Sequence, residues 1–429
     1  MSNDYSNGSA GGNIQELSLL SNKVLVVAYL SSMGHYSLKR CRLCYIKIKR
    51  CLDIFHGIRS VWILRLTLLS CALLFMLVMG FFTHPFEKNY YTEFSYPINE
   101  DVQPYIQQLK AGEQPSLEPL NTFHYNYMKP CNDKCRANKE PVLVIMVKSA
   151  MQNFENRLAI RETWGKEHHF EDGDILSVFL LGNSSDEQLQ TEVDNENLLY
   201  NDIVQSDFHD AYDNNTLKTM SGFRWVFDFC PNARYIFFAD DDMYVSVRNL
   251  LTFLKNPSMY ALPGRNLIYR ISESRKQIAN PNESTTENLA MAVKDLKTND
   301  SSGSHLYAGY VFRSSPLRHW VSKWYVSLEE YPYHLWPPYA TAGAYVVSRQ
   351  ALMDLFYASH YTKLFRFDDV FIGLACLKAN IEPLHSSHFY FWKKPYSLEG
   401  YREVIASHGY GDPKELRFVW NQQKNAGRA

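Results

Sequence analysis

The element that decides the fold is the stretch Tyr235-Ile236-Phe237-Phe238-Ala239-Asp240-Asp241-Asp242-Met243-Tyr244-Val245. Its first five residues are aromatic or aliphatic, and so short an apolar run predicts a buried strand rather than a helix. Three consecutive carboxylates follow, which are costly to bury without partners. They suit the carboxyl end of a sheet strand, where α/β folds bind ligands, and such oxygen ligands favour Mg²⁺ or Mn²⁺.

Asp240 and Asp242 form an Asp-x-Asp pattern, which is typical of nucleotide-sugar glycosyltransferases. Taken alone, three adjacent acids are more often a solvated loop. A phosphatase loop of the form Asp-x-Asp-x-Thr is excluded because position 244 is Tyr. Other parts of the chain have to distinguish the two remaining interpretations.

Length and composition set wide bounds. The 429 residues exceed one ordinary domain, and 46% apolar residues are enough for a core. The net charge of −1 gives no basic field for nucleic acid. Aromatic residues at 14% fit a protein that handles sugars and nucleobases, and fit a well-packed core equally.

Residues 61–82 are apolar apart from Arg65. As a helix of about 33 Å, this segment would cross the hydrocarbon core, with Arg65 reaching the interface. Residues 39–59 carry seven basic side chains against one acid, which predicts a cytoplasmic location for that side. We therefore expect a cytoplasmic tail (1–60), a membrane-embedded signal anchor (61–82) and a luminal remainder.

The luminal part divides into a stem and a folded domain. Residues 83–139 contain six prolines and little periodicity, which predicts an extended stem. Residues 140–429 carry the domain, and the polar segment 256–303 within it predicts a surface insertion. Inside the domain, strands at 142–147 and 175–181 alternate with helices at 156–165 and 217–229. This alternation predicts an α/β fold with a mostly parallel sheet.

Cysteines and sequons agree with an oxidising compartment. Four luminal cysteines predict two disulfides whose pairing the sequence leaves open: Cys131, Cys135, Cys230 and Cys376. Four Asn-x-Ser/Thr sequons lie in the same part of the chain and are candidate glycosylation sites: Asn183, Asn214, Asn282 and Asn299.

Arg157 and Arg161 lie four residues apart, on one face of the predicted helix. Two guanidinium groups there could bind a diphosphate in bidentate fashion. A solvated helix face is the plainer interpretation, and charge spacing alone favours it.

The segment 336–348 combines a proline-stiffened aromatic turn with small residues, including Trp336, Tyr339 and Gly343. Small residues let a ligand approach the backbone, and aromatic rings stack on sugars. A core turn explains the same residues equally well. Further on, Asp368 and Asp369 precede an apolar helix at 370–377. One of these carboxylates could cap that helix, which would leave the other free to act as a base.

These blocks, in this order and spacing, resemble the β-1,3-glycosyltransferases of the galactosyltransferase 31 family over nearly all of residues 140–429. The blocks are Arg-Glu-Thr-Trp-Gly (161–165), Asp-Asp-Asp (240–242), Pro-Pro-Tyr…Gly…Tyr-Val-Val-Ser (337–348) and Asp-Asp-Val-Phe-Ile-Gly (368–373). The runs 315–319, 323–332 and 364–369 most resemble the Brainiac type. The resemblance implies a GT-A fold, a Rossmann-like mixed sheet with helices on both faces, and an inverting mechanism.

The resemblance also implies roles for individual residues. Asp242 and His408 would bind Mn²⁺, with His388 as the alternative histidine. Asp369 would be the general base, ionised at an ordinary Asp pKa of about 3.9. The remaining candidates would contact the UDP-sugar donor: Arg157, Arg161, Asp240, Asp241, Trp336, Tyr339, Gly343 and Asp368.

The implied protein is a type II Golgi membrane enzyme that transfers GlcNAc from UDP-GlcNAc to a β-mannose-terminated glycolipid. A β-1,3-galactosyltransferase using UDP-Gal on a glycolipid or glycoprotein is the alternative. A membrane-anchored carbohydrate-binding protein that lost the chemistry is a rival from another class. A homodimer is compatible with the sequence, which does not decide the oligomeric state.

Overall fold

The computed structural model describes residues 38–135, 140–170, 173–257 and 305–429. The chain forms two compact units, which are described separately here. The first ends at Phe82 and also takes in His319–Val321. The second holds the rest of the chain from Thr83 onward.

The first unit contains one long helix, α2 (Leu38–Val78). Its segment Val61–Val78 is long and apolar enough to cross a membrane, and none of it is buried within the protein. The helix ends four residues before the predicted boundary at Phe82, because Gly80 adopts φ of 73° and turns the chain. The apolar helix is therefore present, and its membrane insertion remains a prediction.

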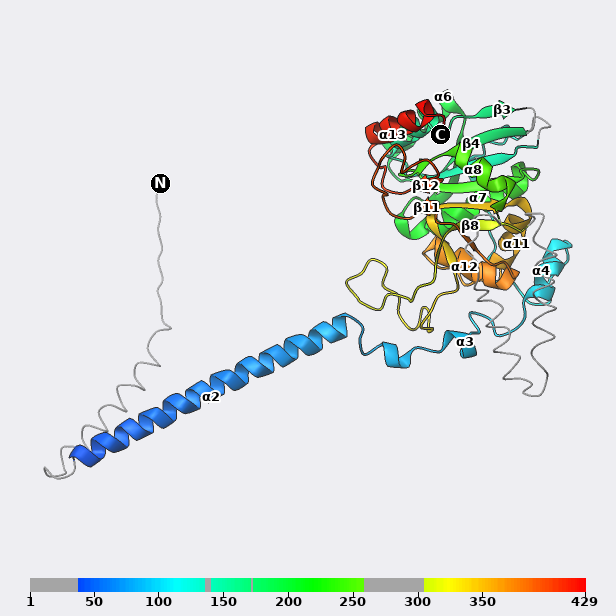
Figure 1. Ribbon diagram of the computed structural model, residues 1–429. Coiled ribbons are helices and arrows are strands. Elements are labelled where there is room, and N and C mark those ends of the chain that lie inside the picture. Colours follow the sequence, from blue (N-terminus) through cyan, green and yellow to red (C-terminus); the bar gives the residue numbers. More distant parts are fainter. Residues whose placement is uncertain (1–37, 136–139, 171–172, 258–304) are drawn as a thin grey trace, which may run out of the picture. The chain divides into compact units, whose positions relative to one another are not determined.

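The second unit is built on a nine-stranded mixed sheet with the strand order β1-β5-β4-β2-β6-β9-β8-β10, and β3 pairs with β4 (Figure 1). The strands β5, β4, β2 and β6 are parallel, whereas β9 runs antiparallel to both β6 and β8. Both predicted strands and the acidic strand are confirmed. The strand bounds are β1 (Tyr127–Lys129), β2 (Leu143–Lys148), β3 (His168–Phe170), β4 (Gly173–Asn183), β5 (Ile203–His209), β6 (Tyr235–Asp240), β8 (Tyr307–Phe312), β9 (Tyr339–Ser348) and β10 (Leu384–His385).

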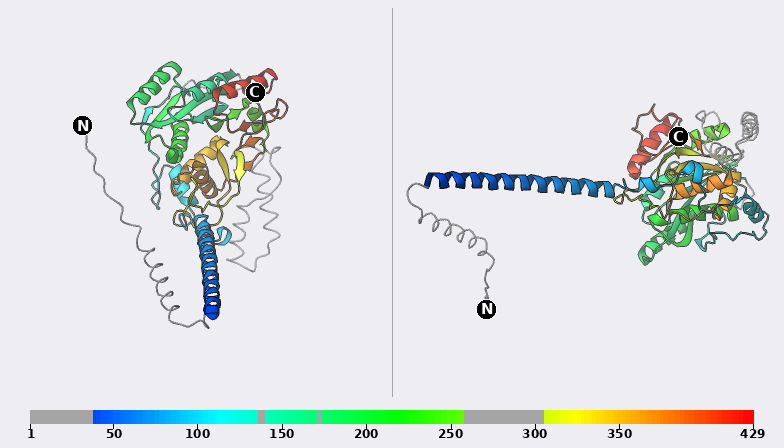
Figure 2. Two further views of the ribbon diagram at one scale, coloured as in Figure 1. Left: turned by 90° about the vertical axis from the view of Figure 1, so that its left-hand side faces the viewer. Right: turned by 90° about the horizontal axis from the view of Figure 1, so that it is seen from below.

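Helices cover both faces of this sheet (Figure 1 and Figure 2). Alternate residues of β2 enter two separate cores, as the two-residue period of a strand requires. One core packs against α7, α11 and α12, and the other against α5, α8 and α13. The predicted α/β class is therefore confirmed. The helix bounds are α5 (Phe154–Glu162), α6 (Glu187–Tyr200), α7 (Asn215–Phe229), α8 (Val247–Lys255), α11 (Arg349–Ser359), α12 (Asp368–Ala379) and α13 (Pro413–Asn425).

A small second sheet lies beside the end of β6. It contains β7 (Tyr244–Val245), β12 (Ala406–Ser407) and β11 (Phe389–Tyr390), with β12 between the other two. Ser407 pairs with Tyr244 in antiparallel register. This pairing brings the chain after β12 next to the turn that follows the acidic strand.

The predicted stem at 83–139 is wrong for most of its length. The short helices α3 (Tyr90–Glu93) and α4 (Gln103–Lys110) belong to the second unit, and β1 pairs with β5 at the sheet edge. Tyr90, Ile106 and Phe123 are buried in the same core as α11 and α12. The apolar residues of this segment lack a regular period because they pack through turns, so sequence periodicity could not reveal them.

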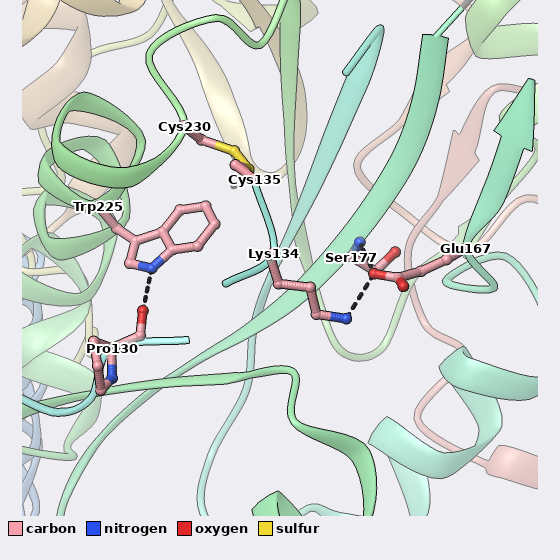
Figure 3. The surroundings of a disulfide bond; sticks show 7 residues. All are labelled: Pro130, Lys134, Cys135, Glu167, Ser177, Trp225 and Cys230. Carbon is pink, nitrogen blue, oxygen red and sulfur yellow. Dashed lines mark hydrogen bonds and ion pairs between the residues drawn. A yellow bond between two sulfur atoms is a disulfide. The ribbon is translucent and has the colours of Figure 1, made fainter. Parts of the chain in front are cut away.

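Two disulfides were expected. Cys135 is bonded to Cys230 (Figure 3). Cys131 and Cys376 are buried free thiols. The bond joins positions 95 residues apart and links the segment that follows β1 to the end of α7. Trp225 of α7 supports the same junction, because its Nε1 donates a hydrogen bond to the carbonyl oxygen of Pro130 (Figure 3).

The predicted insertion at 256–303 lies outside the described residues from position 258 onward, and so do Asn282 and Asn299. Asn183 is the last residue of β4. Asn214 closes a short 3₁₀ turn, and its side-chain amide donates to the carbonyl oxygen of His209 at 2.8 Å.

Candidate active site

The acidic strand β6 ends at Asp240, directly opposite the last residue of β2, Lys148. The buried Lys148 ammonium lies 3.0 Å from Oδ1 of Asp240 and 2.8 Å from Oδ2 of Asp368. Burial would lower the pKa of Lys148, but the two carboxylates raise it above its ordinary value. Sequence reasoning missed this residue. The feature that could have revealed Lys148 is that it is the one charged residue of β2 and stands at the strand's carboxyl end.

Asp368 is the first residue of α12 and is buried between two donors. It accepts hydrogen bonds from Lys148 and, at 2.6 Å, from the hydroxyl of Thr219. Burial opposes its ionisation, but the charge and hydrogen bonds of Lys148 and the Thr219 hydroxyl hold its pKa below the ordinary value. The side chain is 6% exposed, so it orders the site from within.

Asp369, the next residue, has the opposite environment. Burial and the adjacent negative charge of Asp368 raise the pKa of Asp369 to about 7, although the backbone N–H of Val370 donates to its Oδ1 at 2.8 Å. The expectation of an ordinary value near 3.9 is therefore wrong. A carboxyl with a pKa close to neutrality accepts a proton more readily than an ordinary Asp and is still ionised in half the molecules at neutral pH.

Asp240 and Asp241 point in different directions. Burial raises the pKa of Asp240 to about 6, with Lys148 opposing it, and about a third of its side chain is exposed. Asp241 is turned inward, where its Oδ2 accepts from the Ser149 hydroxyl at 2.6 Å and from the Asn153 amide at 2.9 Å. Asp241 therefore braces the loop after β2, and Asp240 is the more accessible of the two.

Arg157 and Arg161 do share one face of α5, but both guanidinium groups are held by carboxylates of the protein. Arg157 is 0% exposed, and its guanidinium donates to Glu196, to Ser149 and to two backbone carbonyls. Arg161 pairs with Asp202 and Glu196. Because a buried guanidinium must have its donors satisfied, Arg157 has none left for a diphosphate. It acts instead through Ser149, which donates to Asp241.

Asp242 and His408 meet across the small sheet. His408 Nε2 lies 3.1 Å from Asp242 Oδ2, and this hydrogen bond raises the pKa of His408. Gly409, at φ of 91°, turns the chain so that the N–H of Tyr410 donates to the Asp242 carbonyl at 2.7 Å. The alternative histidine, His388, contacts the carbonyl oxygen of Glu403.

The side chains of Asp242 and His408 fit a divalent cation. Asp242 Oδ1 is buried and has no hydrogen-bond partner among the residues that the structure describes. Within the same residues, no group of three or more His, Cys, Asp or Glu side chains is gathered as a metal site. Two protein ligands match the way Mg²⁺ and similar ions bind, where water and substrate phosphates supply the remaining oxygens.

The Arg-Glu-Thr-Trp-Gly block (161–165) supports the turn that follows the acidic strand β6. Trp164 is buried, and its indole N–H donates to the carbonyl oxygen of Met243 at 3.0 Å. Gly165 is required by the packing, since a Cβ there would lie 2.5 Å from Cγ2 of Ile160. This block therefore acts as a structural brace.

Two residues of the proline-stiffened turn border the site, and one is buried in the core. A Cβ on Gly343 would lie 3.9 Å from Asp240 Oδ2 and 3.8 Å from the His408 ring, so the missing side chain leaves space there. Tyr339 packs over α12, and its hydroxyl lies 3.1 Å from Ser314. Trp336 lies in the core, where the centre of its buried ring is 4.0 Å from the centre of the Tyr331 ring, so its contact with the donor stays a prediction.

Comparison with known proteins agrees with this arrangement. The galactosyltransferase family model matches residues 155–289 and 284–387. The Drosophila melanogaster protein named beta-1,3-galactosyltransferase brn is 38% identical over 85% of this chain and 98% of its own. Human beta-1,3-galactosyltransferase 1 is 32% identical over 72% of this chain and 81% of its own. A Xenopus tropicalis lactosylceramide 1,3-N-acetyl-beta-D-glucosaminyltransferase is 33% identical over 72% of each.

The protein is therefore a hexosyltransferase, with an acidic strand end at the edge of an α/β sheet. More specifically, the chain belongs to the galactosyltransferase family, and the resemblance to its Brainiac type is confirmed. Among solved structures, the galactosyltransferase LgtC aligns over 67% of this chain at 11% identity with a TM-score of 0.29.

Proposed function

We propose that this protein is an inverting β-1,3-N-acetylglucosaminyltransferase of GT-A type, acting in the Golgi lumen on a β-mannose-terminated glycolipid. The observation that carries the proposal is the pair of adjacent carboxylates at the start of α12, of which Asp368 is neutralised by Lys148 and Asp369 is left with a pKa of about 7. A hydroxyl acceptor needs such a base close to the donor site.

In this mechanism, Asp369 accepts the proton of the acceptor 3-hydroxyl as that oxygen attacks the anomeric carbon. The bond from that carbon to the diphosphate oxygen breaks on the opposite face, and UDP leaves with the electron pair. Lys148 holds Asp240 and Asp368 in place, and Asp242 and His408 would hold Mn²⁺. When bound, the ion neutralises the charge that grows on UDP.

The donor sugar rests on resemblance. The Brainiac-type blocks favour UDP-GlcNAc, and the Xenopus relative is named for GlcNAc transfer to lactosylceramide. Two other relatives are named as galactosyltransferases, which supports UDP-Gal as the second candidate. The same names support a glycan acceptor on a lipid, since one of them specifies a ceramide glycolipid.

The test is a transfer assay on residues 84–429 with UDP-GlcNAc, UDP-Gal and UDP-GalNAc, Mn²⁺ and a β-mannoside acceptor. Asp369→Asn runs beside the parent, and Asp207→Asn, which removes an exposed carboxylate on β5, is the matched control. GlcNAc transfer by the parent and the control, but not by Asp369→Asn, is expected.

Transfer of Gal or GalNAc would overturn the assignment of UDP-GlcNAc as donor and would leave the assignment of Asp369 as base intact. Full activity of Asp369→Asn would reject the mechanism. A folded parent that neither transfers nor hydrolyses any of the donors would favour the carbohydrate-binding alternative.

A further inference from the structure

Four aromatic side chains of the second unit form a continuous cluster that reaches the surface. The centre of the Phe391 ring lies 4.5 Å from that of Phe312, 4.7 Å from that of Tyr310 and 4.5 Å from that of Trp392. Phe391 is 38% exposed and Trp392 is 44% exposed. A single exposed ring is ordinary, but a contiguous exposed cluster marks an interaction surface. We call this cluster the aromatic shelf: Tyr310 and Phe312 of β8, with Phe391 and Trp392 directly after β11.

The outermost ring, Trp392, is not stacked flat on its neighbours. The rings of Tyr310, Tyr390 and Phe391 meet it at 81°, 86° and 88°. Since rings that stack flat on one another have nearly parallel planes, none of these three neighbours covers the indole in that way. A flat ligand ring that arrives from solvent can therefore stack on Trp392.

The aromatic shelf is connected to the candidate base through Tyr339. The ring centres of Phe312 and Tyr339 lie 5.8 Å apart. Tyr339 packs against α12, because a Cβ on Gly373 would lie 2.6 Å from the Cβ of Tyr339. Burial and, after it, the charge of Asp369 raise the pKa of the Tyr339 hydroxyl. The shelf therefore starts beside the helix that carries Asp369 and ends at the exposed Trp392.

An irregularity of β9 brings the same strand to Asp369. The register between β8 and β9 shifts between Gly309 and Val311, where β9 contains surplus residues that include Ala342. Such a bulge frees backbone groups from the ladder. The backbone N–H of Ala342 donates a hydrogen bond to Asp369. Asp369 thus lies against β9, and the neighbouring strand β8 carries the inner half of the shelf.

The segment that carries the two exposed rings is fixed to β12 on both sides. Before the rings, the N–H of His408 donates to the carbonyl oxygen of Tyr390 at 3.1 Å. After them, the N–H of Lys394 donates to the hydroxyl of Ser407 at 3.1 Å. The shelf therefore adjoins the candidate cation ligand His408. A ligand that binds to a segment held in this way loses less affinity to ordering of the protein.

The lysines that follow the rings are both paired. The Lys393 ammonium lies 2.6 Å from a carboxylate oxygen of Glu415, and the Lys394 ammonium donates to the hydroxyl of Tyr390 at 2.7 Å. This stretch therefore offers ring surface rather than available cations, whereas a phosphate or carboxylate ligand would call for charged donors. The chemistry favours a neutral ligand with an apolar face, and a hexose ring presents such a face through its C–H groups.

The position of the shelf determines which sugar of an acceptor it meets. The reacting hydroxyl has to reach Asp369, beside Tyr339. Two successive ring contacts, of 5.8 Å and 4.5 Å between centres, lead from Tyr339 through Phe312 to Phe391. The reacting sugar therefore belongs at the inner end of the shelf, and the sugar to which it is attached belongs at the exposed end.

We propose that Phe391 and Trp392 stack on the second sugar of the acceptor glycan, so that the enzyme prefers a neutral acceptor of two or more sugars to a single β-mannose. The substrate class is a neutral oligosaccharide that ends in the reacting sugar. The proposal rests on the proposed function, because it assumes that Asp369 is the base and that the acceptor is a glycan.

Kinetics on the full-length chain give the first test, with methyl β-mannoside and methyl β-mannosyl-1,4-glucoside as acceptors. The detergent is zwitterionic, because a detergent with a sugar headgroup would compete for the shelf. The KM of the parent should be about tenfold lower for the disaccharide. Trp392→Ala should remove this preference and leave kcat and the KM of the monosaccharide unchanged, since it removes binding and not chemistry.

Two variants control this test. Trp392→Phe keeps a flat ring and should keep most of the preference. Phe418→Ala removes an exposed ring of α13, outside the shelf, and should change neither KM. Equal KM values for the two acceptors in the parent overturn the proposal. An equal loss on both acceptors in Trp392→Ala would mean a structural role and overturns it as well.

Binding is tested without transfer by saturation-transfer NMR of the two glycosides, with UDP and Mn²⁺ present and no donor sugar. In the parent, the glucose ring protons of the disaccharide should receive saturation. In Trp392→Ala the glucose signal should be lost and the mannose signal should remain. Absence of the glucose signal in the parent, or its persistence in Trp392→Ala, overturns the proposal.

Two other occupants of the shelf are outcomes of the same experiments. Octyl β-mannoside that binds as tightly as the disaccharide, and loses that affinity in Trp392→Ala, would assign the rings to the lipid chain. A dimer that depends on Trp392 would assign them to a second copy. Either result overturns the proposal. If the parent transfers no sugar from any donor, the proposed function fails, and the glucose signal still decides whether the shelf binds the second sugar.

Discussion

Replacing Asp369 by Asn is predicted to stabilise the protein while removing its activity. Burial and the charge of Asp368 raise the pKa of Asp369 from 3.8 to about 7. A carboxyl whose folded-state pKa is raised destabilises the fold when it ionises, so the penalty grows from about pH 4 to pH 7 and is complete above pH 7. Asn has nearly the same size and carries no charge.

The pKa shift sets the magnitude. Each unit corresponds to about 1.4 kcal/mol, so the largest gain is roughly 4 kcal/mol. Since Asp369 is partly exposed, we expect about 2–4 kcal/mol at pH 8 and about 1 kcal/mol or less at pH 4.5. The assay is urea unfolding in EDTA at both pH values, followed by tryptophan emission.

Asp368→Asn is the matched control, because it removes the neighbouring carboxylate, which Lys148 and Thr219 stabilise. It should lower the free energy of unfolding at pH 8. The reasoning is refuted if Asp369→Asn is no more stable than the parent at pH 8, or if its gain is the same at both pH values. The parent's transfer rate should also rise with pH through about 7, since the base must be ionised to accept a proton.

Three further outcomes follow from the same contacts. Lys148→Met should lower the free energy of unfolding by about 3–5 kcal/mol in urea, because it leaves two carboxylates without their cation. His408→Ala should weaken Mn²⁺ binding at least tenfold in a titration of free Mn²⁺ by electron paramagnetic resonance, since Asp242 loses the neighbouring ligand. Cys135→Ser should cost about 4–5 kcal/mol under oxidising conditions, because the bond to Cys230 closes a loop of 95 residues, and reducing the parent should have the same effect.

Much of the fold could be predicted because its signals are local. An apolar run followed by carboxylates gave the position of β6, and short apolar runs gave β2 and β4. The four-residue spacing of Arg157 and Arg161 also gave their common helix face correctly. The spacing could not reveal which residue pairs with that face, because Glu196 lies on α6, more than thirty residues further along the chain.

What the sequence left open or hid shares one physical origin, which is long-range packing. Trp336 was equally consistent with a sugar platform and a core turn, and its contact with Tyr331 places its ring in the core. Residues 83–139 looked like a stem because prolines and irregular spacing hide their burial. Tyr90 is nevertheless as deeply buried as residues of the central strands, and Phe123 is only 5% exposed.

Lys148 explains why two adjacent carboxylates can have different roles. Its ammonium is shared by Asp240 and Asp368, and Thr219 completes the coordination of Asp368. Within the described residues Asp369 has no ion-pair partner, and burial together with the charge of Asp368 raises its pKa while that of Asp368 falls. Proton transfer is most efficient when the pKa of the base lies near the working pH. The basicity of Asp369 thus depends on Lys148, which pairs with Asp240 and Asp368. The register of β2 and β6 places Lys148 opposite Asp240, and sequence spacing does not reveal that register.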